Sequence, residues 1–183
     1  MGGTFDPIHI GHLVAASVVH DELKLDQVIF IPAGLPWQKT GTPISSGEDR
    51  LQMVDLAISA DARFTSSDIE IKRPGPTYAI DTVKELMADQ AGHEYFWIVG
   101  ADALESMPTW QNFKELTDLI TIVAVNRNGA GQIKVDFDYA FVQIPEIQIS
   151  ATQIRNRVKA NKPVAYLVAD SVEKFITNSE LYK

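Results

Sequence analysis

The sequence predicts an α/β fold, a Rossmann-like parallel sheet with helices on both faces and a small C-terminal helical part. Short apolar runs alternate with longer stretches of helical period, the pattern of parallel strands joined by crossover helices. Two glycines, Gly2 and Gly3, stand at the first predicted turn from strand to helix. The length of 183 residues suits one domain with a sizeable core, so we predict a single domain over residues 1–183.

The first third of the chain supplies a helix, a strand and a long loop. The helix after His12 has an apolar face, and residues 28–31, Val-Ile-Phe-Ile, form the predicted buried strand that follows. Residues 32–47 form a loop whose length in a compact domain indicates a function. Ser45 and Glu48 form a predicted capping box at the start of the next helix.

The remaining elements follow the same alternation. Residues 64–72 are predicted to be extended, and Thr77 is predicted to cap a helix that runs to about Gln90. Residues 95–99 have the composition of a central strand and place Trp97 in the core. Residues 121–125 and 140–144 complete the strands, with a glycine-containing loop between them.

The N-terminal residues indicate a phosphate site. Gly2 and Gly3 allow close approach of the backbone to a ligand, and His9 and His12 are spaced to face the same way at the start of a helix. Helix N-termini favour anions, so these imidazoles predict a polyphosphate ligand. A metal site is the alternative, but it needs a third ligand, the chain has no cysteine, and nearby only Asp6 could serve.

Two further residues allow two interpretations each. Asp102 follows the strand at 95–99, where it could accept hydrogen bonds from ribose hydroxyls or cap the next helix, and capping is the simpler interpretation. Trp110 could stack on a flat ring or anchor the core, which is the default for tryptophan.

A second anion site is predicted near the C-terminus. Ser150 and Gln153 form a capping box, so a strand that ends near Ile149 should turn directly into a helix. The free N–H groups of this helix start, the hydroxyls of Ser150 and Thr152, and Arg155 could together hold a phosphate. An ordinary capped helix with an exposed Arg155 is the alternative.

Composition restricts the partners. A formal net charge of −8 argues against a nucleic-acid surface, and there is neither an apolar run long enough for a membrane span nor a signal-peptide pattern. We therefore expect a cytoplasmic protein without nucleic-acid or membrane partners. The sequence leaves the oligomeric state open, and a homo-oligomer is compatible with it.

The two motifs together resemble the signatures of the nucleotidyltransferase superfamily, His-x-Gly-His at 9–12 and Ile-Ser-x-Thr-x-x-Arg at 149–155. The first motif in its full form, Gly-Gly-Thr-Phe-Asp-Pro-Ile-His-x-Gly-His-Leu, looks most like bacterial nicotinate mononucleotide adenylyltransferases. The similarity continues at 75–82, 98–104, 107–110 and the closing 181–182.

The resemblance implies transfer of the adenylyl group of ATP to nicotinate mononucleotide, with release of pyrophosphate, by a single nucleotidyltransferase domain. It implies Mg²⁺ bound with ATP and no metal ligands from the protein. The catalytic residues it implies are His9, His12, Lys39 and Arg155. The ATP-binding residues it implies are Gly3, Thr4, Phe5, His9, His12, Gly100, Asp102, Ser150, Thr152 and Arg155. The residues it implies for the pyridine nucleotide are Lys39, Thr77, Tyr78 and Trp110, with Trp110 stacked on the ring.

Two departures from the family pattern stand out. Residues 36–39 read Pro-Trp-Gln-Lys where the family usually has Pro-Pro-His-Lys, which resembles the actinobacterial branch. The family also has a short apolar strand before the two glycines, whereas almost nothing precedes Gly2 here. We therefore expect native chains to be a few residues longer or this one to be less stable.

Other functions share parts of the pattern. Nicotinamide mononucleotide or phosphopantetheine could be the acceptor, and cytidylyl transfer occurs in the same superfamily. The His9–His12 signature also matches class I aminoacyl-tRNA synthetases, although this chain is too short and too acidic to carry their tRNA-binding parts. A non-catalytic ATP sensor is the alternative from a different class.

Overall fold

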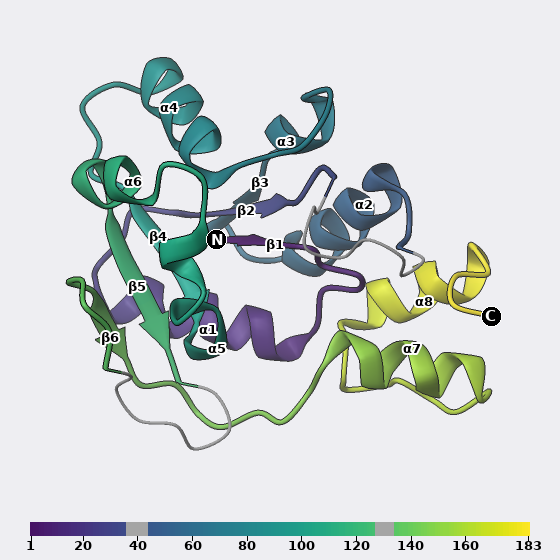
Figure 1. Cartoon of the computed structure of the whole chain (residues 1–183). Coiled ribbons are helices and arrows are strands. Elements are labelled where there is room, and N and C mark those ends of the chain that lie inside the picture. The colour runs from purple at the N-terminus through teal and green to yellow at the C-terminus, as the bar shows by residue number, and fades with distance from the viewer. Residues whose placement is uncertain (36–43, 127–133) are drawn as a thin grey trace.

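The computed structural model describes residues 1–35, 44–126 and 134–183, with the backbone alone at position 102. Parallel strands lie at the centre and helices pack on both sides of them (Figure 1). In chain order the described elements are β1 (Gly2–Gly3), α1 (Ile10–Glu22), β2 (Val28–Pro32), α2 (Gly47–Ile58), β3 (Phe64–Ser66), α3 (Ile69–Lys72), α4 (Ala79–Asp89), β4 (Phe96–Gly100), α5 (Ala101–Leu104), the 3₁₀ helix η2 (Met107–Thr109), α6 (Phe113–Leu119), β5 (Thr121–Val125), β6 (Ala140–Val142), α7 (Ala151–Lys159) and α8 (Asp170–Asn178).

The strands form two parallel three-stranded sheets that meet at β1 and β4. The orders are β1-β2-β3 and β4-β5-β6, and β1 lies beside β4. Gly2 pairs with Ile31 in one sheet, and Val99 pairs with Ala124 in the other. The order of the strands therefore reverses between β1 and β4, where the carboxyl ends of parallel strands leave a crevice for a ligand.

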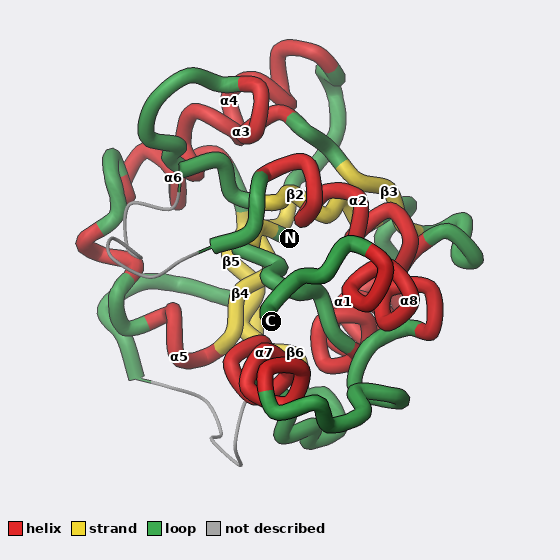
Figure 2. The backbone as a smooth tube through the Cα atoms, turned by 90° about the vertical axis from the view of Figure 1, so that its right-hand side faces the viewer, coloured by secondary structure: helices red, strands yellow, loops and turns green. Residues whose placement is uncertain are grey.

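Alternating side chains of β2, β4, β5 and β6 contribute to two apolar clusters, one on each face of the strands. On β4, Ile98 belongs to one cluster, whereas Trp97 and Val99 belong to the other. Helices α1, α2 and α8 contribute to the first cluster, and α4 and α6 to the second. Figure 2 shows the same arrangement, with the strands in the centre and helices around them. The predicted fold class is therefore confirmed, including the helices α7 and α8 at the C-terminus.

The prediction of extended structure over residues 64–72 was wrong in its second half. Strand β3 ends at Ser66, and residues 69–72 form the short helix α3. The Lys72 backbone N–H donates to the Asp68 carbonyl oxygen at 2.9 Å, and the Lys72 ammonium pairs with the Asp68 carboxylate at 2.8 Å. These contacts close a helical turn in a segment whose alternating Ile and polar residues suggest a strand.

Three predicted helix starts differ in detail. Ser46, not Ser45, caps α2, and its hydroxyl accepts from the Asp49 N–H at 3.0 Å. Tyr78, not Thr77, precedes α4, and Gly100 precedes α5, so Asp102 lies inside that helix rather than at its cap.

The capping box at Ser150 is confirmed, but no strand leads into it. The Gln153 N–H donates to the Ser150 hydroxyl at 3.2 Å, and the Ser150 N–H donates to the Gln153 side chain at 3.0 Å. Residues 143–150 have no regular secondary structure. Among the described ranges, no helix has both the length and the apolar character that crossing a membrane requires.

Candidate functional site

The two histidines of the N-terminal motif lie face to face where α1 begins. His9 precedes the helix in an extended conformation, and the ring centroids of His9 and His12 are 3.7 Å apart with an interplanar angle of 20°. The His9 backbone N–H donates to His12 Nδ1 at 3.2 Å. A neutral imidazole that accepts at Nδ1 carries its proton on Nε2, so this bond makes His12 Nε2 a donor.

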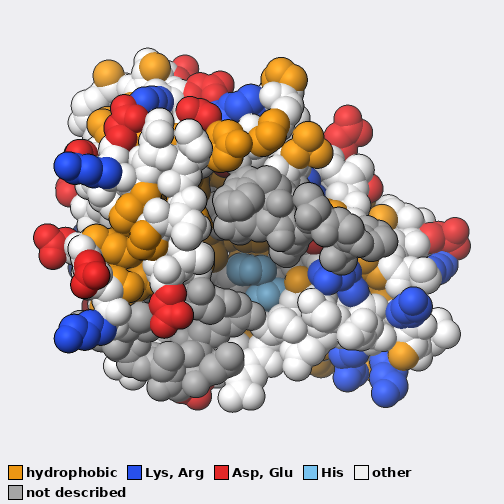
Figure 3. Space-filling model, viewed as in Figure 1, with side chains coloured by type: hydrophobic (Ala, Val, Ile, Leu, Met, Phe, Trp, Pro, Cys, Tyr) orange, Lys and Arg blue, Asp and Glu red, His pale blue; other side chains and the backbone are white. Residues whose placement is uncertain are grey.

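These histidines line a cavity of about 180 Å³ at the carboxyl edge of the sheet. Gly2 and Gly100 form its wall at the β1–β4 junction, and Asn126 lies beyond the end of β5. Figure 3 shows histidine side chains on the floor of a hollow with Lys or Arg side chains along one rim. This cavity occupies the place where the reversal of strand order predicts a nucleotide, and we call it the histidine cavity.

Arg155 joins the second motif to the first. Its Nη1 donates to the Asp6 carbonyl oxygen at 2.7 Å, and its Nη2 donates to the Thr152 hydroxyl at 3.2 Å. Both partners are neutral, so they orient the guanidinium without cancelling its charge. Because Ser150 caps the same helix, the predicted anion site of α7 lies next to the N-terminal loop rather than apart from it.

A second cavity, of about 280 Å³, lies on the other side of β1 and contains Trp110, Thr77 and Tyr78. We call it the tryptophan cavity. The indole Nε1 of Trp110 is buried and has no hydrogen-bond partner among the described residues. Thr77 is buried two residues before α4, and Tyr78 and Ala79 also line the cavity, so the N-terminal end of that helix contributes to the cavity wall.

The two cavities share the wall formed by Gly2, Val99 and Gly100. Ligands in the two cavities would therefore lie next to each other at this wall, two of whose three residues are glycines. This is the geometry that two substrates need if a group is to pass from one to the other.

The structure places the other predicted residues as follows. Gly3 and Thr4 line the tryptophan cavity rather than the histidine cavity. The Phe5 side chain is buried in the core, with its ring at 86° to that of His12 and 5.1 Å away. Lys39, with the rest of 36–43, lies outside the described residues, as does the side chain of Asp102.

Sequence reasoning missed three residues that support the site. Buried Arg50 donates to the carbonyl oxygens of Thr4 at 2.9 Å and Gly34 at 3.2 Å, which joins α2 to the motif loop. Asn126 fixes the chain after β6 by donating to the Ile144 carbonyl at 3.0 Å. Asp6, considered only as a metal ligand, is 3% exposed and bonds other parts of the chain. A polar residue directly after a central strand is a signal that could have identified Asn126.

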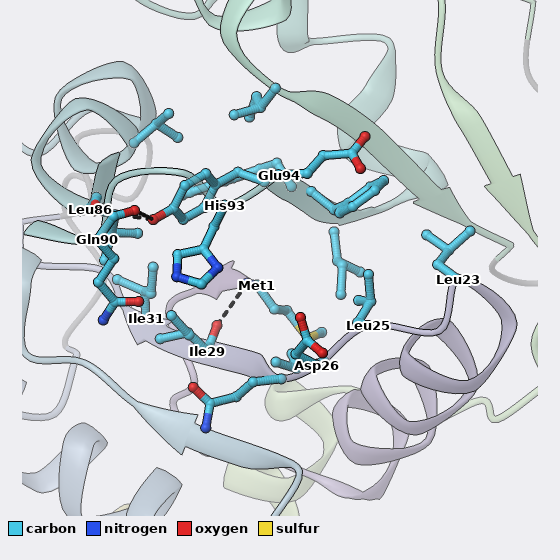
Figure 4. A pocket seen from close by; sticks show the side chains of 18 of the residues that line it. Met1, Leu23, Leu25, Asp26, Ile29, Ile31, Leu86, Gln90, His93 and Glu94 are labelled. Carbon is cyan, nitrogen blue, oxygen red and sulfur yellow. Dashed lines mark hydrogen bonds between the residues drawn. The ribbon is translucent and has the colours of Figure 1, made fainter. Parts of the chain in front are cut away.

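A third cavity, of about 350 Å³, lies at the opposite edge of the sheet, around Met1, Leu25 and Glu94 (Figure 4). None of the predicted site residues whose side chains the structure describes lines it. Although this cavity is larger than the histidine and tryptophan cavities, we do not assign the chemistry predicted by the two motifs to it.

The fold and the site together define a nucleotide-binding transferase with two adjoining cavities. A family model described as cytidylyltransferase-like matches residues 1–157, and the chain belongs to this family.

Relatives and solved structures agree with this assignment. A protein of Corynebacterium kroppenstedtii, named "Probable nicotinate-nucleotide adenylyltransferase", is 44% identical over 187 residues that cover all of this chain and 89% of the relative. A protein of Salinispora tropica with the same name is 45% identical and covered in full. The structure of Plasmodium falciparum nicotinic acid mononucleotide adenylyltransferase complexed with NaAD matches 99% of this chain and 94% of its own at a TM-score of 0.81 and 16% identity, which supports the fold.

Proposed function

We propose that this chain transfers the adenylyl group of ATP to nicotinate mononucleotide and so makes nicotinate adenine dinucleotide for NAD biosynthesis. The main observation in support of this function is that the histidine and tryptophan cavities share a wall formed by Gly2, Val99 and Gly100. The names of the full-length relatives support the choice of substrates. ATP would occupy the histidine cavity and the pyridine nucleotide the tryptophan cavity.

The reaction is an in-line displacement at the α-phosphorus of ATP. A 5′-phosphate oxygen of nicotinate mononucleotide forms the new P–O bond, and the bond to the β-phosphate oxygen breaks with release of pyrophosphate. Such transfers depend on positioning and on neutralisation of charge rather than on a covalent intermediate. His9, His12 and Arg155 would donate to the phosphates, and we assign Lys39 the same role.

Mg²⁺ would enter as part of the ATP substrate. The described residues contain no group of three or more His, Cys, Asp or Glu side chains that could hold a metal ion. We assign Mg²⁺ to the phosphate oxygens of ATP, where such an ion usually keeps several of its waters. Bound there, Mg²⁺ would neutralise charge on the phosphates.

The tryptophan cavity favours a carboxylate over an amide. The start of α4 presents backbone N–H groups and the positive end of the helix dipole beside Thr77 and Tyr78. A carboxylate gains from both, whereas an uncharged amide gains less. We therefore assign nicotinate mononucleotide, rather than its amide, as the acceptor.

Pyrophosphate release with ATP and Mg²⁺ tests the assignment directly. Nicotinate mononucleotide, nicotinamide mononucleotide and phosphopantetheine are compared as acceptors, and we expect kcat/KM at least about tenfold higher for the first, which corresponds to about 1.4 kcal/mol. Equal rates with the amide would contradict the carboxylate argument. ATP binding without pyrophosphate release from any acceptor would favour a sensor.

His12→Ala tests the phosphate donor. Loss of one preorganised donor to developing charge typically lowers kcat by about 10²–10³-fold. His20→Ala is the matched control, because His20 lies in the last turn of the same helix and lines neither of the two cavities. A folded His12→Ala protein with the kcat of His20→Ala would overturn the assignment.

Trp110→Ala tests the pyridine site. Stacking of a base on an aromatic ring contributes about 1–3 kcal/mol, so the KM for nicotinate mononucleotide should rise about 5- to 150-fold. The KM for ATP should stay within about twofold, because Trp110 lines only the tryptophan cavity of the two. A parallel rise of both constants would indicate a general loss of structure instead.

A further inference from the structure

The penultimate residue of the chain reaches the N-terminal motif. The Tyr182 hydroxyl donates to Asp6 Oδ1 at 2.6 Å, across 176 residues of sequence, and lies 3.8 Å from Met53 Sδ. Tyr182 has a φ of 64°, in the left-handed region that bulky residues seldom adopt. The hydrogen bond to Asp6 therefore forms while the Tyr182 backbone has a conformation that bulky residues seldom adopt.

Asp6 connects this phenol to the phosphate-binding arginine. Its carboxylate accepts from Tyr182, while its backbone carbonyl accepts from Arg155 Nη1 at 2.7 Å. Asp6 is 3% exposed, and a buried carboxylate needs donors to remain in place. The position of Arg155 thus depends on a peptide that is anchored through its own side chain.

We propose that Tyr182 is a positioning residue for adenylyl transfer, which fixes Asp6 and through it directs the Arg155 guanidinium toward the triphosphate. The proposal rests on the function proposed above. A phenol suits this role because it satisfies the Asp6 carboxylate without adding a positive charge. A cation at the same place would alter the potential of the phosphate site, whereas the phenol leaves Arg155 to meet the ligand.

The protonation of Tyr182 agrees with this role. Burial, and secondarily the hydrogen bond to Asp6, raises the pKa of the Tyr182 hydroxyl above its ordinary value of 10.0. The phenol therefore stays a donor throughout the neutral range.

Tyr182→Phe removes the donor and leaves the ring. We expect the KM for ATP to rise about tenfold, the effect of losing one hydrogen bond to a charged group, with the KM for nicotinate mononucleotide within about twofold. Tyr95→Phe is the matched control, since the Tyr95 hydroxyl donates to the carbonyls of Leu86 at 3.1 Å and Gln90 at 2.9 Å, away from the motif. If Tyr182 had only a structural role, both variants would have a lower thermal midpoint. The KM for ATP would then be the same in the two variants, and so would the KM for nicotinate mononucleotide.

A double-mutant cycle tests whether Tyr182 acts through Arg155. In an Arg155→Ala background, Tyr182→Phe should change the KM for ATP by less than about twofold, because the residue that it positions is gone. A full tenfold rise in that background would overturn the proposal. Equal KM values for ATP in Tyr182→Phe and Tyr95→Phe would also overturn the proposal.

Binding of inorganic tripolyphosphate separates this proposal from the proposed function. Calorimetry needs no turnover, and we expect about tenfold weaker binding to Tyr182→Phe than to Tyr95→Phe. If no acceptor is adenylylated but this difference remains, the proposed function fails and the positioning role stands. Equal binding to the two variants refutes the role. A chain that ends at Leu181, compared with one that ends at Tyr182, repeats the test if the substitution prevents folding.

Discussion

The buried amine of Met1 predicts a strong pH dependence of stability. The Met1 residue as a whole is partly exposed, but its amine is enclosed and donates to the Ile29 carbonyl at 2.8 Å, as Figure 4 shows. Burial lowers the pKa of this amine from 8.0 to about 5. The folded state therefore binds fewer protons than the unfolded state between these two values, and stability must fall as the pH falls through this window.

Acetylation of the Met1 amine removes the titration and keeps an N–H for the bond to Ile29. Each pKa unit corresponds to about 1.4 kcal/mol, so the free amine costs little at pH 8, about 1 kcal/mol at pH 7 and about 4 kcal/mol at pH 5. The acetylated chain should be more stable than the free chain by these amounts. An extension of the chain before Met1 also converts the amine to an amide, and at pH 7 it should raise the thermal midpoint by about 3–6 °C.

Urea unfolding of both forms at pH 5, 6, 7 and 8 measures the effect. All other titrating groups are common to the two forms, so only the difference between their unfolding free energies is interpreted. A difference that stays constant from pH 8 to pH 5 would refute the reasoning. No change of the thermal midpoint when the amine becomes an amide would contradict the same reasoning.

Three further predictions concern stability and ionisation. Gly34→Ala should lower the free energy of unfolding by about 1–3 kcal/mol in urea, because its Cβ would lie 2.7 Å from the Thr77 methyl and closer still to a backbone carbonyl of α3. Arg50→Met should cost about 3–5 kcal/mol in the same assay, since it leaves three carbonyl oxygens without their donor, and a loss below ~1 kcal/mol would contradict this. The side-chain bond from Arg63 lowers the pKa of Asp61 to about 2, and carboxyl NMR should find it near ~3.9 in Arg63→Gln. The small stabilisation from that partly exposed pair is present above pH 4 and is lost as the pH falls through 2.

The strands and the Ser150 cap could be predicted because their signals are local. Residues 121–125 form β5 with the predicted bounds, since an apolar run buried on both faces has few other conformations available. The Ser150–Gln153 box closes within four residues of sequence and needs no tertiary partner. The histidine pair depends in the same way on one helix start, so its proximity also followed from the spacing.

Features that depend on distant partners could not be predicted. Ile69, Glu70 and Ile71 alternate as a strand would, yet they form α3, with the Glu70 carboxylate buried against the Thr82 hydroxyl at 2.8 Å. Arg50 looks like a solvent-facing residue of an amphipathic helix, but one of its main acceptors lies 46 residues away. In both cases the polar partner comes from another element, so the local spacing of apolar and polar residues in the sequence does not indicate it.

Gly2, at the β1–β4 junction, is required both for packing and for the proposed function. A Cβ on Gly2 would lie 2.8 Å from Trp97 Cζ2, so the indole on β4 already requires glycine there for packing. Gly2 also lies in the wall, with Val99 and Gly100, that the histidine cavity shares with the tryptophan cavity. In the proposed reaction an acceptor oxygen must reach the α-phosphorus of ATP, so the two substrates would have to meet beside this backbone, where a side chain at Gly2 or Gly100 would hold them apart. The ring that packs under Gly2 therefore supports the wall at which the two substrates would meet.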